Sequence, residues 1–154
     1  MLEFVNKTVI EYPIEDVFAI FVKTAKRDFP KFDIKNPIGT TVKREIGNYS
    51  KKKAEATITV TDFKENEIYE INTVTDTAEY KSTYKLEKID DNSCKLTLIE
   101  EQTVADLFGI LNNIMHKFLY KKSIRMRFQY FVQGLNGELQ RRKENMERSA
   151  KKTD

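Results

Sequence analysis

The side chains best suited to acid–base chemistry lie at alternating positions of two predicted strands. Tyr80 and Tyr84 share one face of the first strand, and Glu100 continues the apolar phase of the second. A carboxylate among apolar side chains is costly unless it is paired or protonated, so an inward Glu100 needs a partner such as Arg44 or a tyrosine hydroxyl. Such a cluster would orient a ligand or act as a general acid or base. Alternatively, a bulge near the end of the strand turns Glu100 toward solvent.

The remaining reactive residues have no identifiable partners in the sequence. His116 is the only histidine and Cys94 the only cysteine. We expect a structural role for His116 and a plain strand position for Cys94. A structural zinc site takes four nitrogen or sulfur ligands, which one histidine and one cysteine do not supply. Motifs for phosphate binding, serine hydrolysis and metalloproteolysis are missing as well, so we expect no metal and no cofactor.

Two glycines interrupt the predicted C-terminal helix. Gly134 and Gly137 lie three residues apart, on roughly one face. Glycine inside a helix costs about 1 kcal/mol relative to alanine, so two of them invite an explanation. Close packing against the sheet and a plain surface position are two explanations. The third is room for a ligand, which would make Gly134, Phe128 and Phe131 the helical side of a pocket.

Hydrophobic periodicity indicates the elements that position these residues. Residues 4–12 read as a strand ended by Pro13, and a stripe at helical spacing follows, with acidic residues in its first turn. We expect two short helices there, the second stopped by Pro30. From Gly39 to Thr103 the period is two, and short polar turns favour antiparallel meander pairing. A one-residue slip of a strand would exchange its two faces.

After Thr103 the period returns to 3.6 residues. One apolar stripe runs from Val104 to Leu119 and a second from Ile124 to Leu139. The polar run 120–123 between them predicts a bend or break, and residues 141–154 predict a frayed, solvated tail. No linker or internal repeat appears, so we expect residues 1–154 to form a single domain.

Composition and charge describe an ordinary globular chain. The 154 residues are 40% hydrophobic and 33% charged, with 27 basic and 24 acidic side chains and a net charge of +3. This balance does not indicate a nucleic-acid partner. No apolar stretch is long enough to span a membrane, and the N-terminus does not read as a signal peptide. The single cysteine fits a reducing compartment, so we expect a cytoplasmic protein.

The order of elements and one local segment resemble the START-like superfamily, which includes the birch-pollen-allergen-like and polyketide-cyclase-like proteins. In residues 9–18 a proline and an acidic pair precede a hydrophobic–aromatic doublet: Pro13, Glu15, Asp16, Val17 and Phe18. The chain departs from the pattern at Tyr12, often a small residue there, and at Phe18, often tryptophan. The resemblance implies an α+β helix-grip fold, in which about six to seven curved antiparallel strands wrap a long C-terminal helix. It also implies a cavity for an apolar molecule between sheet and helix.

Three functions compete at this point. The leading one is a binding protein for an apolar small molecule or lipid, with Tyr80, Tyr84, Glu100, Phe128, Phe131 and Gly134 lining its cavity. The second is an interaction module, a homodimer included, that uses the long helix or a sheet edge. The third is a cyclase- or hydrolase-type enzyme using Glu100, Tyr80, Tyr84 or His116, and it requires at least two of these groups to converge in one pocket. Fold alone does not choose among them.

Overall fold

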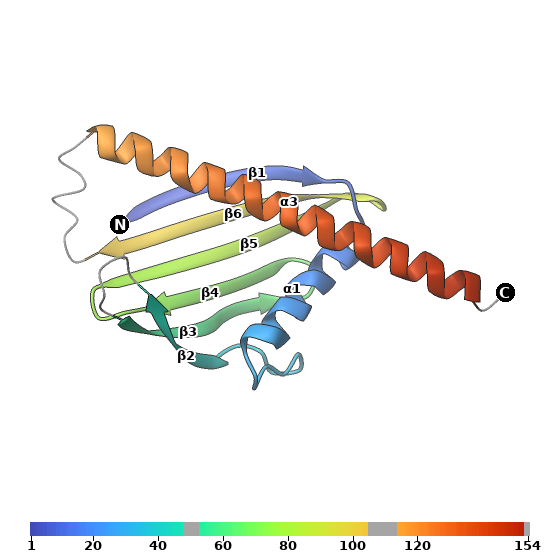
Figure 1. Ribbon diagram of the computed structural model, residues 1–154, viewed down its shortest axis with the longest axis horizontal. Coiled ribbons are helices and arrows are strands. Elements are labelled where there is room, and N and C mark those ends of the chain that lie inside the picture. Colours follow the sequence, from blue (N-terminus) through green and yellow to red (C-terminus); the bar gives the residue numbers. More distant parts are fainter. Residues whose placement is uncertain (48–52, 105–113, 153–154) are drawn as a thin grey trace.

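The computed structural model describes the backbone of residues 1–47, 53–104 and 114–152; within these ranges, the side chains of 46–47, 53–54, 104 and 114–120 are not described. Six antiparallel strands form one sheet in the order β1-β6-β5-β4-β3-β2 (Figure 1). The strands are β1 (Leu2–Ile10), β2 (Thr41–Gly47), β3 (Lys53–Lys64), β4 (Ile68–Val74), β5 (Ala78–Asp90) and β6 (Ser93–Val104). The helices are α1 (Ile14–Asp28) and α3 (Ile114–Lys152). The predicted α+β helix-grip architecture is confirmed.

The sheet is a meander from β2 to β6, closed by the long-range pairing of β1 with β6. The predicted turns follow from local chemistry. Asp90 Oδ1 accepts hydrogen bonds from the Asn92 amide and the Ser93 hydroxyl, both at 2.8 Å, where β5 turns into β6. Asn66 takes a positive φ of 61° between β3 and β4, a conformation that asparagine tolerates better than most residues. β1 and β2 are the two edges of the sheet.

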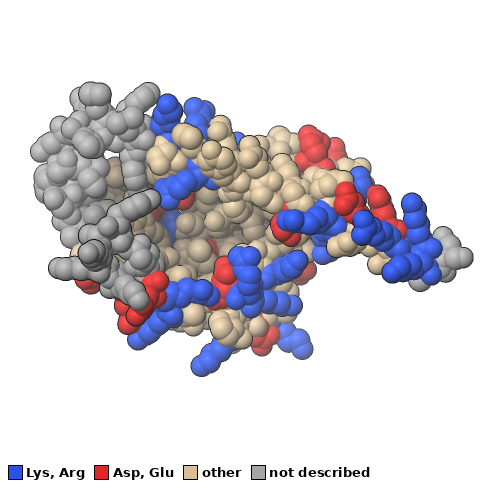
Figure 2. Space-filling model, in the orientation of Figure 1, with Lys and Arg blue, Asp and Glu red and all other residues tan. Residues whose placement is uncertain are grey.

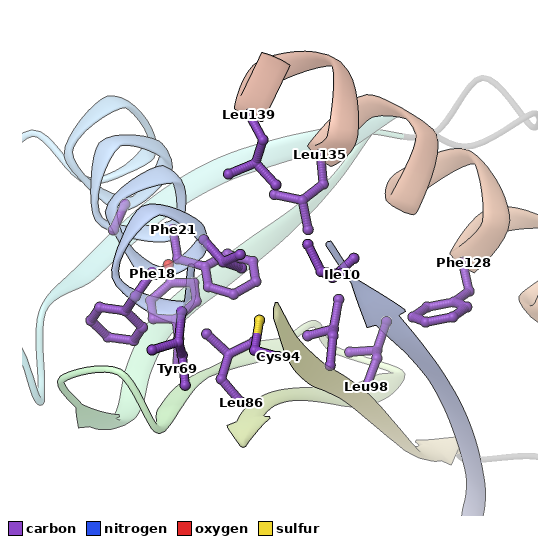
Figure 3. Close-up of a cluster of buried hydrophobic side chains, with 14 of the residues drawn as sticks. Ile10, Phe18, Phe21, Tyr69, Leu86, Cys94, Leu98, Phe128, Leu135 and Leu139 are labelled. Carbon is purple, nitrogen blue, oxygen red and sulfur yellow. The ribbon is translucent and has the colours of Figure 1, made fainter. Parts of the chain in front are cut away.

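Both helices cover the same face of the sheet, which we call the inner face. It carries Tyr69, Leu86, Leu96 and Leu98, which form one buried cluster with side chains from α1 and α3 (Figure 3). Tyr84, on the same face, is partly buried and packs against this cluster. Leu96 is fully buried and Leu98 is 5% exposed, so the predicted phase of β6 is confirmed. The core therefore lies between the inner face and the two helices.

α1 is one continuous helix of 15 residues, so the prediction of two short helices is wrong. Pro13 stands at its N-cap position, and acidic and basic residues occupy its first and last turns. No helix breaker lies between Pro13 and Pro30, and the buried stripe runs without interruption. The stripe consists of Ile14, Val17, Phe18, Phe21 and Ala25.

α3 is also continuous, over 39 residues, and it contradicts two expectations. Residues 120–123 neither bend nor break it, because Lys121, Lys122 and Ser123 are exposed and polar residues are tolerated on a solvated helix face. The helix also continues to Lys152, where we expected a frayed tail. Its end projects beyond the sheet in Figure 1.

Contacts with α1 and its entry turn anchor the base of that projecting end. The Tyr12 hydroxyl donates to Gln140 Oε1 at 2.8 Å, and Arg142 lies 3.4 Å from Asp16. Within the helix, Gln140 donates to Glu144 at 3.1 Å. Pairs spaced three or four residues apart stabilise helices by about 0.2–0.5 kcal/mol each.

In the described ranges, neither helix is long and apolar enough to cross a membrane. Among the same residues, no three histidine, cysteine, aspartate or glutamate side chains are grouped to hold a metal ion.

Candidate functional site

The helices leave part of the inner face uncovered, although it belongs to the central strands. On β4 and β5, the cross-strand partners Ile71 and Ser82 are half-buried, and so is Thr73, while its partner Tyr80 is 38% exposed. Inner-face residues of central strands would be buried if the space above them were filled. Figure 2 shows a hollow on this face, between α3 and the strands toward the β2 edge of the sheet. The inner face thus offers a solvent-accessible recess beside the packed core.

Glu100 lies on the inner face, at the side of this hollow. It stands on β6 opposite Ser82 of β5 and Phe4 of β1, two positions after the buried Leu98. The outward turn considered as the alternative is not seen, because the β1–β6 register runs without a bulge from Leu2 to Ile10. Glu100 points inward, in the phase of Leu96 and Leu98, as the site argued from the sequence requires.

The electrostatics of Glu100 are unusual for a strand residue. Burial raises the pKa of its carboxyl above the ordinary value, and the positive charge of Arg127 on α3 partly opposes this. Within the described residues, no hydrogen bond or ion pair joins the Glu100 side chain to another group. Arg44, the partner suggested by the sequence, instead donates to the backbone oxygen of Asp28 at 2.6 Å. Glu100 is therefore a half-buried acceptor whose hydrogen-bonding capacity is open.

Aromatic rings form the wall next to Glu100. The Tyr84 ring centroid lies 5.2 Å from that of Phe21, 5.4 Å from Phe131 and 6.1 Å from Tyr69. Burial, with a smaller contribution from the Glu100 charge, raises the pKa of Tyr84 to about 12. The Tyr84 hydroxyl is therefore protonated at neutral pH and acts as a donor or acceptor of hydrogen bonds, not as a base.

α3 presents a row of residues along the hollow. Arg127, Phe131 and Gly134 follow one another at spacings of four and three, so they share one side of the helix. A Cβ atom built on Gly134 would meet nothing within 4 Å, and the same holds for Gly137. Close packing against the sheet therefore does not explain either glycine. Space beside α3 is open at Gly134, which continues the row formed by Arg127 and Phe131.

The predicted site residues separate into two groups. Tyr80, Tyr84, Glu100 and Phe131 lie on the inner side of the sheet–helix pair, with Gly134 open beside them. Phe128 is 6% exposed and belongs to the buried core near Leu98 (Figure 3). The side chain of His116 lies outside the described residues.

One residue of the site, Arg127, comes from outside the predicted set, and Cys94 lies outside the site. Sequence reasoning did not single out Arg127, although its spacing of four from Phe131 was a usable signal. Cys94 is fully buried in the core, and burial raises the pKa of its thiol to about 11. The Cys94 thiol is therefore a packing group, not a nucleophile.

A protein-family comparison places these features in a known group. The family model described as "Domain of unknown function (DUF3284)" matches residues 5–121, a range that includes residues of all six strands. The chain belongs to this DUF3284 family. No curated protein sequence matches the chain.

Several solved structures have folds similar to that of this DUF3284 protein. The Zhui aromatase/cyclase from Streptomyces sp. R1128 is 10% identical, with a TM-score of 0.62 over 92% of this chain and 94% of that one. A START superfamily protein from Mycobacterium smegmatis is 13% identical, with a TM-score of 0.58 over 90% and 97%. Ara h 8.0201 has the same identity, TM-score and coverages as the latter. These likenesses establish a START-like fold, and the predicted resemblance is confirmed.

Proposed function

We propose that this protein binds a small, largely apolar molecule in the hollow between the inner face and α3. The observation that carries the proposal is Glu100, a half-buried carboxyl without a described partner beside uncovered apolar and aromatic side chains. Folding has partly desolvated this group, and a ligand that donates a hydrogen bond to it would offset that cost. The START-like fold, shared with an aromatase/cyclase, supports a ligand-binding role.

The chemistry of the hollow defines the ligand class. Ile71, Phe131 and the ring of Tyr84 offer apolar contact, so most of the ligand surface is apolar. Glu100 accepts hydrogen bonds when ionised, so the ligand carries at least one donor, and an ammonium group would gain the most. The Tyr84 hydroxyl adds a second polar contact point. The expected ligand is an apolar ring or chain with one amine or hydroxyl.

Binding fits the described residues better than acid–base catalysis. An enzyme of the cyclase or hydrolase type would need a second titratable group next to Glu100. Tyr84 is close enough for its pKa to respond to the Glu100 charge, but a pKa of about 12 keeps its proton in place at neutral pH. The described part of the hollow thus combines one carboxyl with hydrogen-bonding hydroxyls, which suits recognition.

The test compares two neighbouring glutamates with opposite orientations. Glu100→Gln preserves shape and removes the charge, and Glu101→Gln does the same on the outer face, where Glu101 pairs with Lys81. Isothermal titration with naphthylethylamine and with ethylnaphthalene separates the amine contact from apolar burial. We expect Glu100→Gln to weaken amine binding about tenfold or more, the scale of a charged hydrogen bond, and to leave ethylnaphthalene unchanged.

The Glu101→Gln protein should bind both compounds like the wild type. Equal amine affinity in the wild type and both variants would remove Glu100 from the site. A wild-type protein that binds neither compound would contradict this ligand class.

A further inference from the structure

A second concave surface lies on the other side of α3, along the free edge of β1. In the part of the chain that the structure describes, β6 is the one strand that pairs with β1. Between β1 and α3 runs a groove of about 970 Å³, lined by residues 3–6 of β1 and by residues of α3 between 121 and 129. A hollow of about 490 Å³ continues it along residues 5–8 and between 125 and 133. The edge of a sheet thus borders an open channel.

The helical wall of this groove is basic. Lys121, Lys122 and Arg125 are exposed, and none of them forms an ion pair within the described residues. The strand wall contributes Glu3 near one end and Lys7 farther along. Among the described residues that line the groove, cations therefore outnumber acidic groups, and an acidic ligand would be favoured.

The two walls have matching repeats. Lys121, Arg125, Gln129 and Gln133 line the groove at intervals of four residues, which is about 6 Å along a helix. Every second side chain of an extended strand is spaced by about 6.6 Å. From the first hollow to the second, β1 advances by two residues while α3 advances by four, so both walls run in the same direction. A strand laid on the β1 edge would present alternate side chains to successive residues of this row.

We propose that this groove binds an extended acidic peptide segment of another protein, which adds to β1 as a further strand. Its backbone pairs with the free edge of β1, and its alternate carboxylates face Lys121, Lys122 and Arg125. A nucleic-acid strand would satisfy the cations but not the peptide groups of an edge strand. A second copy of this chain, paired symmetrically through β1, would bring the same cations together.

This peptide site is independent of the small-molecule hollow. Arg125 and Gln129 face the β1 edge, whereas Arg127 and Phe131 lie on the side of α3 that faces Glu100 and Tyr84. Either proposal can fail without affecting the other.

The first test measures charge recognition with the full chain. The probe is a fluorescein-labelled eight-residue peptide of alternating glutamate and valine, titrated by fluorescence anisotropy. We expect the double variant Lys122→Glu/Arg125→Glu to bind at least tenfold more weakly than the wild type. The matched control Lys31→Glu/Lys35→Glu makes the same charge change at two exposed positions between α1 and β2, and it should bind within twofold of the wild type.

The second test measures backbone pairing, which charge alone would not require. One peptide carries N-methyl groups on every glutamate and another on every valine, because successive residues of a strand point their N–H groups to opposite edges. At least one of them should lose tenfold or more in affinity. The proposal would be overturned if both methylated peptides bound as tightly as the unmethylated peptide, or if the two charge variants lost affinity equally. It would also be overturned if the wild type bound no peptide, if it bound single-stranded DNA more tightly than the peptide, or if it formed a dimer that the Lys122→Glu/Arg125→Glu variant does not form.

Discussion

Glu100 and Glu101 are neighbours on β6 but face opposite sides of the sheet. Glu100 stands on the inner face beside the aromatic wall, and Glu101 lies on the outer face, where one of its carboxylate oxygens is 2.7 Å from the Lys81 ammonium. The Glu101 carboxylate thus forms an ion pair on the outer face, whereas the Glu100 carboxyl has no hydrogen-bond partner among the described residues and lies in the hollow. It also makes the two positions a natural experimental pair.

The raised pKa of Glu100 predicts a specific pH dependence of stability. The folded state holds this proton more tightly than the unfolded state, so its contribution to the free energy of unfolding falls as pH rises from the ordinary to the raised pKa. Glu100→Gln removes that loss. Relative to the wild type, the variant should therefore gain stability at pH 7 compared with pH 4. Urea unfolding at both pH values measures the difference, and a relative gain at pH 4 instead would contradict the assignment.

Substitutions at Gly134 should affect stability and ligand binding separately. Because a Cβ there meets nothing within 4 Å, Gly134→Ala should raise the free energy of unfolding by about 1 kcal/mol through helix propensity alone. Gly134→Leu should retain the fold but weaken binding of naphthylethylamine, since its side chain extends beside Phe131. Gly137→Leu is the matched control on the same helix. Equal binding by both leucine variants would place Gly134 outside the ligand site.

Phe21 joins α1 to the rest of the aromatic wall. Its ring centroid lies 6.2 Å from Tyr69, 5.2 Å from Tyr84 and 6.3 Å from Phe131, so it touches two strands and α3. We expect Phe21→Ala to lower the free energy of unfolding by about 3–5 kcal/mol, as in other truncations of buried phenylalanine. Denaturant titration tests this, with the exposed Tyr130→Ala as control. A loss below 1 kcal/mol would mean that α1 is not held through this ring.

The Cys94 thiol should be unreactive in the folded protein. It is fully buried, and its pKa of about 11 leaves almost no thiolate at pH 8. Ellman's reagent should therefore react slowly with the native protein and rapidly in denaturant. Rapid reaction of the native thiol would show that β6 opens locally or that the core is not closed around it.

The sequence by itself determined the kinds of element and most of their faces. Alternation from Gly39 to Thr103 places Leu96, Leu98 and Glu100 in one phase, and no bulge in β6 interrupts that phase. Apolar spacing between Ile124 and Leu139 likewise identifies the buried side of α3, as Figure 3 shows for Phe128, Leu135 and Leu139. These features are local, because side-chain direction in a strand or helix repeats over two to four residues.

Tertiary structure decided what depends on groups that lie far apart in the chain. The pairing of β1 with β6, the proximity of Arg127 to Glu100 and the contact of Arg44 with Asp28 join segments whose sequence separation carries no periodic signal. Helix continuity also involved tertiary contacts at the base of the projecting end of α3, where Gln140 and Arg142 meet Tyr12 and Asp16. Whether a polar stretch frays or stays helical depends on such partners, because helix propensity alone is a weak guide.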